Sequence, residues 1–174
     1  PDPKVRWAAA DMLATLKDAS GLDMMIKDLR AFSSQAEQLE HSLEVARVLA
    51  QLGDISGYEL AADLAANGTT HGQRWRAAVV LAHLANLDDT TVASEGFDPL
   101  GVLKTMAADE EHKGVFFVFI DQLHKILQDR RDMIDIFAIA KDSKYHSEPP
   151  PGNQFSMAEI FHSVAVRDKD KTWR

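Results

Sequence analysis

The sequence contains no cysteine. This absence excludes disulfide bonds, zinc sites with thiolate ligands and catalytic cysteine nucleophiles. It leaves the cellular compartment open, although a chain without a disulfide framework fits a cytoplasmic location, which we expect here.

Long apolar runs are also missing. The densest one, VFFVFI at residues 115–120, is much shorter than the roughly 20 apolar residues that a membrane-spanning helix needs. No signal peptide is visible either. We therefore expect no membrane partner. The chain begins with Pro1, which indicates an excised piece of a longer polypeptide or a processed product.

Basic residues are fewer than acidic ones. The chain has 19 Lys and Arg against 27 Asp and Glu, a formal net charge of −8, and residues 1–142 hold 14 of the basic and 23 of the acidic residues. Because such a body repels phosphate, we expect no nucleic-acid partner. The charge favours basic or amphipathic protein partners instead.

Tryptophan is scarce, yet two of the three tryptophans occur in the same phrase. RWAAADMLATL at residues 6–16 returns as RWRAAVVLAHL at residues 74–84, and HSLEVARVLAQL at residues 41–52 aligns with both, at shifts of 36 and 32 residues. A looser fourth copy follows near Phe117. A period of this length is typical of stacked helical repeats.

Each copy predicts a helix, a short turn and a second helix. Apolar residues recur at three- and four-residue steps along one face of the first helix, and KDASG and GDISG supply turns in the first two copies. We expect the first helix of the third copy to run from Gln73 to Leu84. The β-branched run at 115–120 favours a strand by propensity, but its place in the repeat predicts a helix. In the first helix the shared face consists of Val5, Ala9, Met12, Leu13 and Leu16. The predicted copies span residues 3–32, 38–67, 71–109 and 112–142.

The phrase DPKVRWAAADMLATLKD at residues 2–18 resembles the HEAT-like repeat of bacterial arrays and phycobilisome lyases, in which D-P-x-V-R-x-x-A-A-x-x-L-x-x-L-x-D recurs. The third copy keeps the arginine as Arg74, whereas the second has Ser42 in its place. The resemblance covers residues 2 to about 142 and implies an all-α fold: a right-handed α-α superhelix, or solenoid, of about four hairpins. Such repeats serve unrelated functions.

Five residues are candidates for partner binding. Trp7 and Trp75 either wedge between neighbouring copies, as aromatic side chains mostly do, or anchor a partner on an exposed groove. For Arg6 and Arg74, the resemblance implies pairing with turn aspartates such as Asp18, Asp54, Asp88 or Asp89, and the alternative is recognition of a partner carboxylate. The fifth candidate is Arg76.

The same resemblance also brings two enzymatic functions into question. Deoxyhypusine hydroxylase, built from similar hairpins, binds iron through His-Glu dyads, but here the order is reversed at Glu40-His41 and Glu111-His112. A metal site from His41, His71 and His112 is a weaker interpretation than solvated helix-start residues. HEAT-like DNA glycosylases need a basic surface, which the net charge disfavours. We expect no catalytic residue, no metal and no cofactor.

The C-terminal part changes character. Residues 143–154, SKYHSEPPPGNQ, predict a linker because of their prolines and polar residues. A short helix is then predicted within residues 155–174, where Ser156 and Glu159 fit a capping box. It docks either on the fourth copy or on a partner or second copy of the chain, because so short a helix is marginal alone. Its apolar side consists of Phe155, Ile160, Phe161 and Val164.

From the sequence we therefore expect a non-catalytic scaffold or adaptor that binds a protein or peptide. The alternative is a lyase-associated or chaperone-like protein that holds a chromophore or a client.

Overall fold

A computed structural model describes residues 3–16, 18–87, 92 and 95–109. The predicted fourth copy, residues 115–120, the linker at 143–154 and the helix carrying Phe155, Ile160, Phe161 and Val164 lie outside the described residues, so those predictions stay predictions. Within the described part all regular structure is helical, in agreement with the expected all-α class. None of the helices described is long and apolar enough to cross a membrane.

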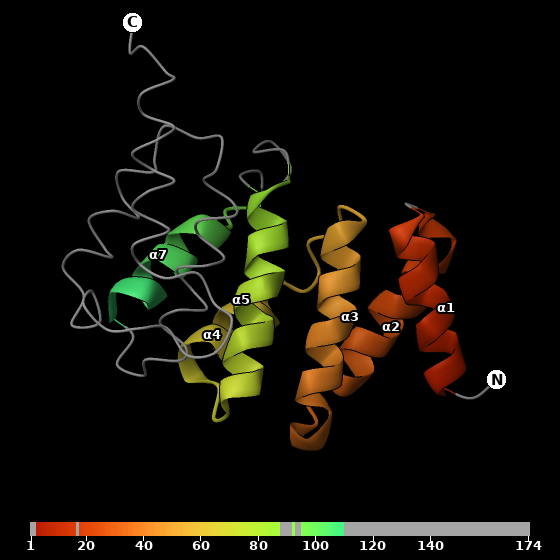
Figure 1. The fold of residues 1–174 in the computed structure, drawn as a ribbon, viewed down its shortest axis with the longest axis horizontal. Coiled ribbons are helices and arrows are strands. Elements are labelled where there is room, and N and C mark those ends of the chain that lie inside the picture. Colours follow the sequence, from red (N-terminus) through yellow and green to blue (C-terminus); the bar gives the residue numbers. More distant parts are fainter. Residues whose placement is uncertain (1–2, 17, 88–91, 93–94, 110–174) are drawn as a thin grey trace, which may run out of the picture. The chain divides into compact units, whose positions relative to one another are not determined.

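The helices alternate with short turns (Figure 1). They are α1 (Pro3–Thr15), α2 (Leu22–Phe32), α3 (Leu39–Gln51), α4 (Tyr58–Asn67), α5 (His71–Ala85) and α7 (Pro99–Asp109), and single 3-10 turns at Ala19–Gly21 and Ala36–Gln38 precede α2 and α3. The chain divides into two compact units, Pro1–Leu100 and Gly101–Arg174. All of the packing and all of the sites discussed below belong to the first unit.

Three helices of the first unit form a row. In Figure 1, α1, α3 and α5 lie side by side and run in the same direction, and α3 contacts both of its neighbours in the row. The helices between them in the chain pack forward: α2 contacts α3 and α4 contacts α5. Each of these helices packs more extensively on the row helix that follows it than on the row helix that precedes it.

The core lies along α3 and α5. Alanine, valine and leucine side chains dominate it, so the helices can approach closely. The largest fully buried side chains of the first unit are Met25, Leu43, Leu49, Leu81 and Leu84. Because α3 lies between two row helices and also contacts α2 and α4, only one narrow side of it reaches solvent.

The turns after α1 and α3 have the same local structure, as the shift of 36 residues predicts. The Asp18 carboxylate accepts a hydrogen bond from the backbone N–H of Ser20 at 2.9 Å, and that of Asp54 accepts one from Ser56 at 2.8 Å. A glycine follows each turn as the residue before the second helix. Each aspartate therefore stabilises the turn in which it lies through this hydrogen bond.

The predicted apolar face of α1 is largely exposed. The periodicity places Val5, Met12 and Leu16 on one face, but these side chains are 62%, 67% and 75% exposed. Among the α1 residues whose burial is described, the buried one is Ala10, which is 2% exposed. The reason is the forward packing: α2 lies against α3, so it leaves the predicted apolar face of α1 uncovered.

The start of α5 also differs from the prediction. The helix begins at His71, with Thr70 as its N-cap, and not at Gln73. The Thr70 hydroxyl accepts from the Gln73 backbone N–H at 3.1 Å, and the Gln73 side-chain oxygen accepts from the backbone N–H of Thr70 at 3.4 Å and from that of Thr69 at 2.9 Å. Gln73 is thus the third residue of the helix, where its side chain closes a capping box.

Candidate binding groove

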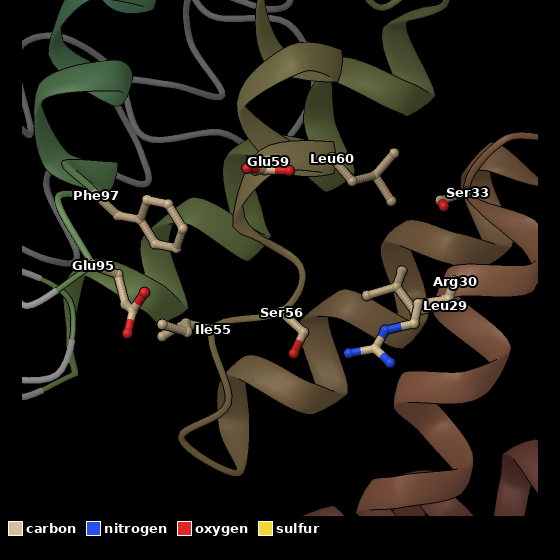
Figure 2. Close-up of a pocket in the computed structure, with 9 residues that line it drawn as sticks. All are labelled: Leu29, Arg30, Ser33, Ile55, Ser56, Glu59, Leu60, Glu95 and Phe97. Carbon is tan, nitrogen blue, oxygen red and sulfur yellow. The ribbon is translucent and has the colours of Figure 1, made fainter.

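A groove opens between α2, α4 and the segment that follows α5. Figure 2 shows the side chains that line it, and its volume is about 570 Å³. The apolar part of the lining consists of Leu29, Ile55, Leu60 and Phe97, and the polar part consists of Arg30, Ser33, Ser56, Glu59 and Glu95. The sequence analysis did not single out any of these residues as a site.

Charges of opposite sign lie at different places in the groove. Figure 2 shows Arg30 on the α2 side and Glu95 on the other side, with Glu59 on α4 between them. None of the three side chains forms an ion pair with another described residue. All three are exposed. The groove therefore offers one cation and two carboxylates to a ligand from outside.

An aromatic contact holds one wall of the groove in place. The ring of Phe97 stacks on that of Tyr58, at the start of α4, with centroids 4.2 Å apart and an interplanar angle of 17°. The Tyr58 hydroxyl accepts a hydrogen bond from the backbone N–H of Asp98 at 3.3 Å. These two contacts fix the segment that carries Glu95 next to α4.

The backbone of this wall makes a tight turn. The carbonyl oxygen of Val92 accepts from the backbone N–H groups of Glu95 and Phe97, both at 3.3 Å. Gly96, between them, has φ of +73°, a conformation that glycine adopts without the steric cost paid by other residues. The glycine thus lets Glu95 and Phe97 lie together on the groove side.

A chain of ion pairs links α1, α3 and α5 on the side of the row. Arg47 of α3 contacts Asp11 of α1 at 2.9 Å and Glu44 at 3.0 Å. Arg76 of α5 contacts Glu44 at 3.1 Å and Glu40 at 3.3 Å. Arg76, a predicted partner-binding residue, is thus engaged within the protein.

These ion pairs join equivalent positions of neighbouring copies. Asp11 and Arg47 are 36 residues apart, and Glu44 and Arg76 are 32 residues apart, which are the two repeat shifts. Burial on its own would lower the pKa of Arg47, but the hydrogen bonds that its guanidinium donates to Glu44 and Asp11, together with the charges of these carboxylates, outweigh burial and raise that pKa. The guanidinium therefore stays charged, and the ion pairs connect the row helices in register.

Trp75 lies beside a small hollow of about 120 Å³ near these ion pairs. The side chain is 41% exposed, and the guanidinium carbon of Arg76 lies 5.7 Å from its ring centroid. Leu43, its counterpart in the second copy, lines the same hollow and is fully buried. Trp75 thus contacts packed residues on one side and solvent on the other. This position agrees with packing between copies and also with partner binding.

The other predicted site residues stay predictions. The side chains of Arg6 and Trp7 lie outside the described part of the structure. Arg74 has its own interactions, and its side chain is half-buried. The structure does not bring Arg74 or Trp75 into the groove between α2 and α4.

The histidines and carboxylates of the described residues were candidates for metal binding or titration. Among the described residues no group of three or more His, Asp or Glu side chains is placed to hold a metal ion. The rings of His41 and of Phe32 in α2 meet at an interplanar angle of 66°, with centroids 5.7 Å apart. Burial, together with the charge of Arg47, lowers the pKa of His83 below its usual value of 6.5. His83 is therefore neutral at pH 7.

The described residues thus include a row of three helices, a groove lined by charges of both signs and a half-exposed tryptophan. Comparison of the chain with protein families, with curated proteins and with solved structures gives no match.

Proposed function

We propose that the protein is a non-catalytic interaction scaffold whose groove between α2 and α4 binds a linear segment of a partner protein. The observation that carries this proposal is the groove itself, with a volume of about 570 Å³ and one cation and two carboxylates in its lining. Unpaired charges on a surface make binding selective, because they repel partner groups of like charge and attract those of opposite charge. A cytoplasmic location belongs to the same proposal and rests on composition alone.

In this proposal the row of α1, α3 and α5 is part of a right-handed solenoid of HEAT-like hairpins. Two observations support it: the ion pairs join equivalent positions, as in Arg47–Asp11 and Arg76–Glu44, and the turns at Asp18 and Asp54 share one hydrogen-bonding pattern. Stacked repeats present extended surfaces for partners.

The lining of the groove specifies the chemistry of the bound segment. A Lys or Arg of the partner would lie near Glu59 and Glu95, and an Asp or Glu would lie near Arg30, whose guanidinium can hold a carboxylate in two parallel hydrogen bonds. An apolar side chain between them would cover Leu60 and Phe97. A peptide carries such a combination more readily than a small apolar ligand.

Selection from a displayed library of random peptides tests the proposal directly. The protein is expected to enrich peptides that contain a basic and an acidic residue separated by apolar ones. The double variant Arg30→Glu, Glu59→Lys reverses two of the three charges in the groove and leaves the net charge unchanged. We expect it to weaken the binding of the selected peptides at least about tenfold, through loss of two charge-assisted contacts.

A matched control is available on α2. The double variant Asp23→Lys, Lys27→Glu also reverses two exposed charges without changing the net charge, and neither residue lines the groove. It should bind the selected peptides as the wild type does. Enriched peptides that bind the groove variant and the wild type equally would refute the proposed site.

A further inference from the structure

The ring of Phe97 presents one uncovered face to the groove between α2 and α4. Its other face is covered by Tyr58, because the two rings are stacked with centroids 4.2 Å apart and an interplanar angle of 17°. Phe97 lines the groove and is partly exposed, whereas Tyr58 does not line it. The stack therefore holds the Phe97 ring in place and leaves the face opposite Tyr58 available to a ligand.

Two carboxylates lie near this ring. Glu59 directly follows Tyr58 at the start of α4. Glu95 lies two residues before Phe97, in the turn where the N–H groups of both donate to the carbonyl oxygen of Val92. Figure 2 shows the ring between the two carboxylates. Neither carboxylate has an ion-pair partner within the part of the chain that the structure describes.

An aromatic face with a carboxylate on either side suits arginine better than lysine. The guanidinium is planar, so it can stack on a ring while its N–H groups point outward, within its own plane, to carboxylates. The ammonium group of lysine is a compact, strongly hydrated charge. It can pair with Glu59 or Glu95, but it gains less from the ring of Phe97.

We propose that Phe97 is a specificity-determining residue of the groove, because an arginine of the bound segment stacks on its uncovered face and pairs with Glu59 and Glu95. The groove therefore selects arginine over lysine at this position, and the neighbouring apolar residue of the segment covers Leu60. This inference rests on the proposed function, since it names the basic residue that the groove prefers.

Two forms of one peptide test the inference on the full chain. The peptide is one that is selected on the wild-type protein and bound more weakly by the groove variant Arg30→Glu, Glu59→Lys. It is synthesised with either arginine or lysine at its basic position, with blocked ends and a fluorescent label, and binding is followed by anisotropy. We expect the arginine form to bind the wild type about fivefold more tightly than the lysine form.

The ratio of the two dissociation constants also separates the role of the ring from a purely structural role, which would weaken both forms alike. In the variant Phe97→Leu we expect the two forms to bind equally. Phe97→Tyr keeps an aromatic face and should keep the ratio of the wild type. The matched control is Phe32→Leu, which changes an aromatic side chain of α2 that does not line the groove, and it should keep the ratio too.

Two results would overturn this inference alone. One is a lysine form that binds the wild type as tightly as the arginine form, and the other is a preference for arginine that persists in Phe97→Leu. Both leave the proposed function standing, because the peptide still distinguishes the wild type from the groove variant. The first comparison uses no variant of Phe97, so it decides even if Phe97→Leu does not fold. If the groove variant weakens no selected peptide, the proposed function fails and this inference fails with it.

Discussion

Two glycines at equivalent positions differ in how closely neighbouring atoms approach them. Gly21 and Gly57 both precede a second helix, 36 residues apart. A Cβ atom at Gly57 would lie 2.4 Å from the Cβ of Ala46 and 3.0 Å from its Cα, whereas at Gly21 the nearest atoms, on Met25 and Leu13, are 3.8 and 3.9 Å away. The approach of the α4 start to α3 therefore requires glycine, and the approach at Gly21 does not.

We predict that Gly57→Ala destabilises the protein by about 2 kcal/mol more than Gly21→Ala, because the methyl group added at Gly57 collides with the Cβ and Cα of Ala46, which cannot rotate away, whereas at Gly21 it makes ordinary contacts. Both substitutions replace a glycine before a helix, so their effects on capping are matched. Urea unfolding of the two variants measures the difference. Equal losses of stability would contradict the packing of α4 against α3.

The stability of the protein also depends on pH through a single residue, His83. Its pKa in the folded protein is lowered by burial and by Arg47, so the unfolded chain takes up the proton first as the pH falls below 6.5. The unfolding free energy should therefore decrease between pH 6.5 and the folded pKa, and no loss from this group is expected above 6.5.

The substitution His83→Gln removes this titration. We predict that the unfolding free energy of the variant falls less between pH 7 and pH 5 than that of the wild type. An NMR titration of the His83 imidazole in the folded protein supplies the direct check, and a midpoint at or above 6.5 would disagree with the environment described for this residue.

Among the elements, α5 depends most clearly on its first turn. Thr70 and Gln73 close a capping box, and Gln73 is buried. The pattern Thr-x-x-Gln before an apolar helix was a signal that the sequence offered, and using it would have moved the predicted start of the helix from Gln73 to His71.

We predict that Thr70→Ala costs about 1 kcal/mol of stability, the usual cost of losing a threonine cap. Thr15→Ala is the matched control. The Thr15 hydroxyl donates to the carbonyl of Asp11 near the exposed end of α1, so its loss should cost less than about 0.5 kcal/mol. Chemical denaturation distinguishes the two, and equal costs would argue against the capping role of Thr70.

Helical periodicity predicted which residues share a face, but not what covers that face. The second helices of the first two copies, α2 and α4, begin directly after the predicted turns KDASG and GDISG. On the predicted apolar face at the start of the chain, Met12 and Leu16 are exposed. A single sequence contains the period of a helix, whereas the choice between packing backward and packing forward depends on the geometry of the turns.

The whole molecule adds features that no local pattern contains. The groove brings together Arg30, Glu59 and Glu95 from three separate segments, and the ion pair between Arg47 and Asp11 spans two row helices. Neither is visible until the helices are packed. The repeat shifts did contain part of this information, because they align the positions that meet across the row.

At this scale the central claim is that the groove selects its partner by charge. The most direct measurement is a charge-exchange cycle with one peptide selected on the wild-type protein. Arg30→Glu should weaken its binding at least about tenfold, and replacing the acidic residue of the peptide by lysine should restore binding to the variant while weakening binding to the wild type. If the exchanged peptide fails to recover affinity for the Arg30→Glu variant, Arg30 does not face a partner carboxylate and the account of the groove is wrong.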